Sequence, residues 1–224
     1  MKKVLIAGGT GLIGRQVVAE LANREDNHLV ALVRRPATHV PNRVTQVVVD
    51  FNQGIDGLKK VLSDESFDVL ICAIGTTMRV AGSKQAFTKI DHDIPISLLK
   101  YGTMQTAKPK FIYVSSLGAD QPYGFYLDTK HAVEKEIFAS NLQYVIARPS
   151  LLLGDRSERR LGEAVAQKVM PVFFKTLEAT PLSRTQWFKR YRPVTGLAVA
   201  NRIVAEVFAE QQAQALILEG NDFA

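Results

Sequence analysis

Cysteine is almost absent from this sequence of 224 residues, and Cys72 is its single thiol. One thiol cannot form an intramolecular disulfide, which excludes a disulfide-stabilised secreted scaffold and is typical of a reducing compartment. Long apolar runs are missing too, since none reaches the about 18 residues that indicate a membrane-spanning helix. The short apolar start at residues 4–7 breaks into glycines without a signal-peptide cleavage pattern. We therefore expect a cytoplasmic protein without a membrane span.

Internal repeats, low-complexity tracts and linkers are also absent. The composition is that of an ordinary globular protein, with 46% hydrophobic and 22% charged residues, and we expect one domain spanning residues 1–224. Charge is uneven along it, because residues 155–192 hold nine basic and four acidic side chains. We expect this segment to form a small basic lobe appended to the domain. It suits an anionic substrate or is simply solvated, and nucleic-acid binding is the weaker alternative.

Short runs of valine, isoleucine and leucine alternate with amphipathic segments along the chain. Continuous apolar strands separated by helices favour a parallel sheet that helices cover on both faces. The sequence thus predicts an α/β fold with a doubly wound parallel sheet and a small C-terminal substrate lobe. The expected strands are residues 3–7, 29–33, 45–49, 69–73, 110–114, 144–147 and 215–218, and the expected helices are 15–22, 58–62, 84–101, 129–140 and 194–210.

Three glycines lie between the first expected strand and the first expected helix, at positions 8, 11 and 14. In a dinucleotide-binding loop the first glycine allows a tight turn, the second lets backbone approach the pyrophosphate, and the third lets helix and strand pack closely. The N–H groups at the start of the helix then face the anion. The sequence therefore predicts a Rossmann-like fold that binds a dinucleotide through Gly8, Thr10, Gly11, Leu12, Ile13 and Gly14.

No acidic residue ends the second expected strand, where an NAD-preferring site carries one for the ribose 2′-hydroxyl. Arg34 and Arg35 stand there instead. Two guanidinium groups suit bidentate binding of a phosphate, so the sequence predicts NADP rather than NAD, with a solvated basic turn as the alternative. Asp50 ends the third expected strand, where it either meets the adenine or is a simple turn residue.

A serine pair and a Tyr-x-x-x-Lys motif follow the expected strand at 110–114. Ser115 and Ser116 end that strand, and Tyr126 and Lys130 come next along the chain. Residues i and i+4 of a helix share a face, so the phenol and the ammonium can point into one cleft. The ammonium stabilises the phenolate and brings the pKa of the tyrosine toward the working range. A serine hydroxyl can hold the carbonyl oxygen of a substrate.

With these motifs the sequence resembles the short-chain dehydrogenase/reductase superfamily over most of its length. It is most similar to the atypical branch of small NAD(P)-binding proteins related to the Tat-interacting protein. The stretches that carry this closer resemblance are Ile-Gly-Thr-Thr at 74–77 and Ser-Ser-Leu-Gly-Ala-Asp at 115–120.

The resemblance implies a role for each matching residue. Ser116 matches the catalytic serine, with Ser115 as the alternate beside the cofactor, and Tyr126 matches the acid/base. Lys130 matches the lysine that tunes the tyrosine and also bonds the nicotinamide ribose. The remaining matches lie along the cofactor: Gly75 and Thr76 under its middle, and Arg148, Pro149 and Ser150 beside the nicotinamide.

One position departs from the family pattern, which often has a proton-relaying asparagine in the fourth helix region. Residues 89–93 here read Lys-Ile-Asp-His-Asp, with Asp91 in the middle. No metal is expected at His92, because neighbouring helical positions cannot converge on one ion. The intact tyrosine and lysine favour an NADP-dependent oxidoreductase that acts on a small-molecule carbonyl or alcohol, as a monomer or a homodimer. The departure at Asp91 favours the alternative, an NADP(H)-binding regulator that catalyses nothing.

Overall fold

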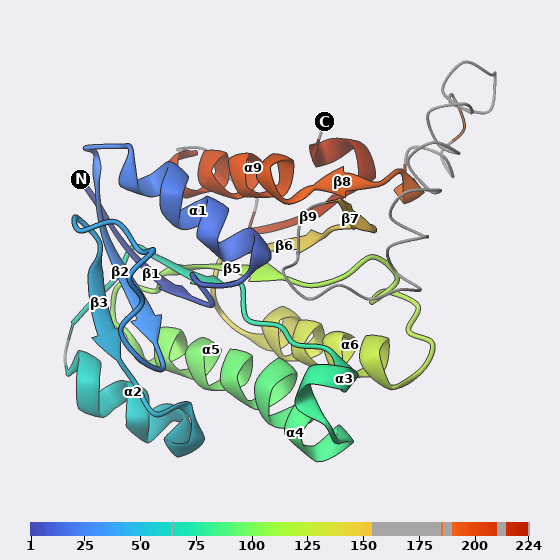
Figure 1. Cartoon of the computed structure of the whole chain (residues 1–224), viewed down its shortest axis with the longest axis horizontal. Coiled ribbons are helices and arrows are strands. Elements are labelled where there is room, and N and C mark those ends of the chain that lie inside the picture. The colour runs from blue at the N-terminus through green and yellow to red at the C-terminus, as the bar shows by residue number, and fades with distance from the viewer. Residues whose placement is uncertain (64, 154–184, 186–189, 210–213, 224) are drawn as a thin grey trace.

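A parallel sheet of seven strands forms the centre of the computed structural model (Figure 1). The structure describes residues 1–63, 65–153, 185, 190–209 and 214–223. The strand order is β3-β2-β1-β4-β5-β6-β9, and every neighbouring pair is parallel. The strands are β1 (Lys2–Ala7), β2 (Asn27–Val33), β3 (Thr45–Val48), β4 (Val69–Cys72), β5 (Lys110–Val114), β6 (Tyr144–Arg148) and β9 (Ala215–Glu219).

Helices cover both faces of the sheet, as the alternating sequence pattern predicted. Helices α1 (Leu12–Ala22) and α9 (Gly196–Phe208) pack side by side on one face (Figure 1). The other face carries α2 (Gly54–Leu62), α5 (Ile94–Met104) and α6 (Phe125–Ala139) (Figure 1). Each layer encloses its own apolar cluster, because the side chains of successive strand residues point to opposite faces of the sheet. The prediction of a doubly wound α/β fold is confirmed.

The strand order reverses beside β1, which pairs with β2 on one side and with β4 on the other. In open α/β sheets, ligands bind outside the carboxyl ends of the strands at such a reversal. The glycine loop follows β1, residues 73–77 follow β4, and the serine pair follows β5. The fold thus brings three separate motifs of the sequence to one edge of the sheet.

The helix expected over residues 84–101 is interrupted. Its parts are α4 (Lys84–Thr88), a π-helical turn η2 (Lys89–Asp93) and then α5. Pro95 follows the turn and has no N–H to donate to the carbonyl of Asp91, so the regular α-helical ladder cannot continue through it. Apolar periodicity predicted the helix but could not show this wider turn.

Short elements complete the described part of the chain. They are η1 (Phe51–Gln53), α3 (Met78–Ala81), β7 (Leu152–Leu153), β8 (Val194–Thr195) and η4 (Gly220–Phe223). The helix expected at 194–210 starts two residues later than predicted, because residues 194–195 pair with β7 as β8. The basic lobe expected at 155–192 lies outside the described residues, apart from Thr185 and residues 190–192, and stays a prediction. Within the described residues, no helix combines the length and apolarity needed to cross a membrane.

Candidate active site

Two glycines shape the loop after β1. Gly8 has a φ of +90°, and a Cβ there would lie 2.5 Å from the backbone of Ala73, so only glycine fits the turn. A Cβ on Gly14 would lie 2.1 Å from the carbonyl oxygen of Gly8. The missing side chain at Gly14 therefore lets α1 start directly against the loop, and its first N–H groups face the carboxyl edge of the sheet.

Gly11 is the exposed N-cap of α1. A Cβ there would lie 3.3 Å from the Gly8 carbonyl oxygen, a tight approach, and a larger side chain would fill the space in front of the helix. This cradle of backbone fits a pyrophosphate. Thr10 is exposed and Leu12 is half-buried, whereas the side chain of Ile13 is buried in the core, so Ile13 can meet a ligand only through its backbone.

Arg34 and Arg35 follow β2, and both side chains are exposed. Neither forms a hydrogen bond or an ion pair with another residue of the described ranges. Asp50, after β3, accepts hydrogen bonds from the Asn52 backbone N–H at 3.0 Å and from the Gln53 side chain at 3.2 Å. The bond from Asn52 is the main cause that lowers the pKa of Asp50. Asp50 thus caps η1, as its turn interpretation expected, and contact with an adenine stays a prediction.

The two serines after β5 have different surroundings. Ser115 is buried, and its hydroxyl donates to Glu134 Oε1 at 2.5 Å. Ser116 is half-buried, and its hydroxyl bonds to no other residue of the described chain. Of the two hydroxyls, the geometry leaves that of Ser116 available to a substrate.

Tyr126 lies in the first turn of α6, which begins after Gly124 at a φ of +82°. Its side chain is 40% exposed, and its ring meets the ring of Phe87 edge-on with the centroids 5.9 Å apart. Lys130 follows one turn later and is only 3% exposed. The phenol therefore reaches the surface of the candidate site, while the ammonium lies in the protein beneath it.

Lys130 is held by a buried carboxylate. Its Nζ lies 3.0 Å from Oδ1 of Asp91 and 5.3 Å from the ring centroid of Tyr113. Burial by itself lowers the pKa of the Lys130 ammonium, but the oxygens of Tyr113, Asp91 and Tyr126 outweigh burial and raise it. Burial likewise raises the pKa of the Tyr113 phenol. Oδ2 of Asp91 accepts a hydrogen bond of 2.8 Å from the backbone N–H of Thr76, next to exposed Gly75.

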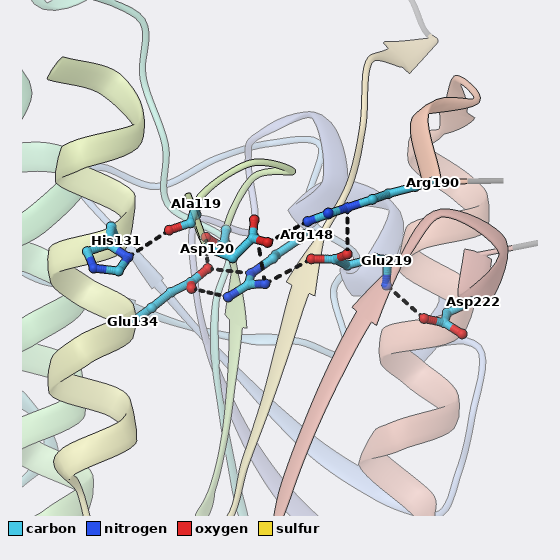
Figure 2. A network of polar contacts seen from close by, with 9 residues as sticks. Ala119, Asp120, His131, Glu134, Arg148, Arg190, Glu219 and Asp222 are labelled. Carbon is cyan, nitrogen blue, oxygen red and sulfur yellow. Dashed lines mark hydrogen bonds and ion pairs between the residues drawn. The ribbon is translucent and has the colours of Figure 1, made fainter. Parts of the chain in front are cut away.

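Arg148 ends β6 and is enclosed by carboxylates rather than open to a ligand (Figure 2). Its guanidinium donates to Glu134 on α6 at 2.6 and 3.0 Å and to Glu219 at the end of β9 at 2.8 Å. Pro149 is buried, and its carbonyl accepts from Leu117 N–H. Ser150 donates its hydroxyl to the carbonyl of Arg192. These three residues connect the loops around the candidate site, and contact with a nicotinamide stays a prediction.

Arg190 extends this network toward the loop after β5 (Figure 2). Its guanidinium lies 2.6 Å from Asp120 and 3.1 Å from Glu219. His131, on α6, places Nδ1 2.7 Å from the carbonyl oxygen of Ala119, so this nitrogen donates the bond. The loop after β5 therefore contacts α6 through Ala119 and is linked to β9 through Asp120 and Arg190.

Sequence reasoning missed two polar residues of this region. Asp91 was noticed only as a departure from the family pattern, and Glu134 was not considered. Glu134 stands four residues after Lys130, on the same helix face, and this spacing was the signal that could have found it. The inward position of Asp91 had no such signal, because Asp91 lies within the π turn, which the apolar periodicity did not show. Within the described chain, no three histidine, cysteine or acidic side chains come together as a metal site.

Comparison with known proteins shows which family this chain belongs to. A family model described as NAD(P)H-binding matches residues 8–171. Protein FMP52 of Candida albicans is 30% identical over 169 residues, which cover 73% of each chain. Protein HTATIP2 of Rattus norvegicus is 33% identical over 173 residues, which cover 75% of this chain and 69% of that protein.

Solved structures show the same fold. The oxidoreductase ylbE of Lactococcus lactis is similar with a TM-score of 0.66 and 21% identity, over 96% of this chain and 88% of that one. UDP-glucose 4-epimerase of Thermotoga maritima is similar with a TM-score of 0.72 and 16% identity, over 97% and 76%. At these identities the likeness concerns the fold alone.

The relatives correct the predicted location. The FMP52 proteins of Candida albicans, Meyerozyma guilliermondii and Emericella nidulans are all named mitochondrial, which contradicts the cytoplasmic location expected from the sequence. The expectation was wrong because a single cysteine indicates a reducing compartment without saying which one.

The resemblance drawn from the sequence motifs is confirmed. The glycine loop, the parallel sheet, the family match and the relatives all agree. The chain belongs to the NAD(P)H-binding family of Rossmann proteins, as an atypical short-chain dehydrogenase/reductase similar to HTATIP2.

Proposed function

We propose that this protein is an NADP-dependent oxidoreductase that transfers hydride between the nicotinamide and a small carbonyl or alcohol substrate. The proposal rests on the placement of Ser116 directly after β5 and of Tyr126 and Lys130 in the first turns of α6, on the side of the sheet where the glycine loop follows β1. A partly exposed phenol one helical turn from a buried ammonium suits proton transfer to a substrate oxygen.

Each of the three side chains has a separate task in this reaction. The cofactor, when bound, supplies or accepts the hydride. Ser116 holds the substrate oxygen through its available hydroxyl. Tyr126 donates a proton to that oxygen as the carbonyl becomes an alcohol, and takes it back in the reverse direction. Lys130 stabilises the phenolate that remains, because a fixed positive charge favours the anion.

Arg34 and Arg35 support the choice of NADP. They stand where an acidic residue would select NAD, and they are exposed and unpaired within the described part of the chain. A guanidinium pair with no partner of its own can bind the 2′-phosphate without first breaking another contact.

A Tyr126→Phe substitution tests the reaction. It keeps the ring that packs on Phe87 and removes only the hydroxyl. We expect the fold and NADPH affinity to be kept and turnover to fall about 100- to 10,000-fold. Loss of NADPH absorbance with a panel of aldehydes and ketones measures turnover. Tyr123→Phe is the matched control, since Tyr123 lies three residues earlier and is 92% exposed.

The outcomes separate the alternatives. A Tyr126→Phe variant with wild-type turnover contradicts the proton-donor role. A wild type that binds NADPH yet reduces no member of the panel contradicts the enzymatic proposal and favours the NADP(H)-binding regulator.

A further inference from the structure

Asp91 and Lys130 form an ion pair that is closed off from solvent. Asp91 is 0% exposed, and Nζ of Lys130 lies 3.0 Å from its Oδ1. A buried charge without a partner is costly, and an opposite charge at contact distance offsets much of that cost. The position of the ammonium therefore depends on the carboxylate.

The second oxygen of Asp91 holds a different part of the site. Oδ2 accepts the backbone N–H of Thr76 at 2.8 Å, in the turn after β4. A Cβ added to Gly75 would lie 3.5 Å from Oδ1 of Asp91 and 3.8 Å from Nζ of Lys130. The Gly75–Thr76 turn thus rests directly on the ion pair, and one carboxylate connects it to α6.

Asp91 lies in the middle of the π turn η2 and is the buried residue of that turn. Its neighbours His92 and Asp93 bond to each other at 2.9 Å, and both are more exposed than Asp91. An extra residue in a helical turn rotates the following side chains relative to a regular helix, and such turns are frequent at functional sites. Of the two carboxylates in this turn, that of Asp91 is buried and that of Asp93 is exposed.

Lys130 faces ionisable groups from four elements: Asp91 on η2, Tyr113 on β5, Cys72 on β4 and Tyr126 on its own helix. Burial raises the pKa of the Cys72 thiol to about 11 and that of Tyr113 further, so both are neutral near pH 7. Glu134, one turn beyond Lys130, is engaged by Arg148. Within the described residues, Asp91 is thus the carboxylate that pairs with Lys130.

We propose that Asp91 is a positioning residue that clamps Lys130 with one oxygen and the Gly75–Thr76 turn with the other. The clamp holds the ammonium beneath Tyr126 in its charged form and links it to the turn expected under the cofactor. Any effect of the clamp on turnover rests on the proposed function. The ion pair and the hydrogen bond that form the clamp do not depend on it.

The test follows the charge of Lys130 by NMR, through the chemical shift of its ¹³Cε as the pH is raised. The full-length chain is used, and the Lys130 signal is assigned as the one that is missing from the spectrum of Lys130→Arg. In the wild type we expect no titration of this signal up to about pH 11, beyond the ordinary lysine pKa of about 10.4. In Asp91→Asn, which keeps an acceptor for Thr76 but removes the charge, we expect the midpoint to fall toward or below that ordinary value, because no carboxylate then offsets the burial of the ammonium. Asp93→Asn, two residues away and exposed, is the control and leaves the signal unchanged.

An unchanged titration in Asp91→Asn overturns the clamp even if the wild type is an active reductase. The expected titration in a wild type that binds NADPH and reduces nothing leaves the clamp standing and contradicts the proposed function. In an active enzyme, Asp91→Asn also moves the pH profile of turnover, which a purely structural role does not.

A second comparison applies if Asp91→Asn does not fold. Lys130→Met leaves the Asp91 carboxylate buried without a partner, and the double variant Asp91→Asn/Lys130→Met removes that charge as well. We expect the double variant to melt at a higher temperature than Lys130→Met. An equal or lower melting temperature contradicts the pairing.

Discussion

Side chains at the carboxyl edge of the sheet differ in how firmly the protein holds them. Ser115 and Lys130 are buried and bonded to carboxylates, so they contribute to the fold as well as to the candidate site. Arg34 and Arg35 are exposed, without a bonded partner among the residues that the structure describes. Replacing either arginine is therefore expected to change ligand binding and to leave the stability of the fold unchanged.

Arg34→Ala should weaken NADPH binding and leave NADH binding nearly unchanged. A charge-assisted hydrogen bond contributes about 1.5–3 kcal/mol, so we expect the NADPH dissociation constant to rise by about one to two orders of magnitude. Only NADPH carries the 2′-phosphate, which makes NADH the internal control. Fluorescence titration with both cofactors measures the effect, and equal weakening of both contradicts the assignment.

At the scale of elements, β5 meets the last turn of α9 through one lysine. Lys110, at the amino end of β5, is buried, and its Nζ donates to the backbone oxygen of Glu206 at 2.6 Å. The carbonyls that end a helix carry partial negative charge and attract a cation. Burial opposes this attraction and lowers the pKa of Lys110 to about 8. The charge of Lys110 at this contact between strand and helix is therefore lost as the pH rises above about 8.

Lys110→Met should remove the contribution of Lys110 to the pH dependence of the free energy of unfolding. The pKa of this lysine rises from about 8 in the folded chain to an ordinary 10.5 on unfolding. Between these values the unfolded chain binds more protons, so the wild-type free energy of unfolding rises with pH, by at most about 1.4 kcal/mol per unit. We expect the wild type to gain stability over Lys110→Met from pH 8 to 10.5.

Urea unfolding at several pH values measures this difference. Lys100→Met, at an exposed position of α5, is the control and should run parallel to the wild type. A constant difference between Lys110→Met and the wild type across the window contradicts the role given to Lys110.

Across the whole molecule, one ionic network connects elements that are far apart in the chain (Figure 2). Arg148 on β6 pairs with Glu134 on α6 and with Glu219 on β9. Arg190 joins Glu219 to Asp120 in the loop after β5. The network therefore connects β9, the last strand of the sheet, to the loop after β5. We expect its buried ion pair (its interior) to contribute more to the free energy of unfolding than its partly exposed ion pair (its rim).

Glu134→Gln should destabilise the protein much more than Asp120→Asn. Glu134 and Arg148 are buried, and breaking a buried pair costs about 3–5 kcal/mol, with the lower end expected because Glu219 still pairs with Arg148. Asp120 and Arg190 are partly exposed, where an ion pair is worth about 0–1 kcal/mol. Chemical denaturation of both variants measures the difference, and equal losses contradict the division into interior and rim.

Much of the fold could be predicted from local patterns. The apolar runs indicated the strands, because a strand covered on both faces of a parallel sheet reads as a nearly continuous apolar run. Gly8 and Gly14 could be recognised from their spacing between the first strand and the first helix. The structure shows why each must be glycine: Gly8 has a positive φ, and a Cβ on Gly14 would collide with the backbone of Gly8. Tyr126 and Lys130 could be placed on one helix face from their spacing alone.

The sequence by itself thus determined the strand segments, the glycine loop and the candidate Tyr126–Lys130 pair, since each depends on neighbours a few residues away. Only the tertiary structure decided which serine is free, what Lys130 pairs with and how Arg148 is used. Ser115 meets Glu134 19 residues further on, and Arg148 meets Glu219 71 residues further on. Such contacts depend on which elements the sheet order brings together, and no local periodicity reports that order.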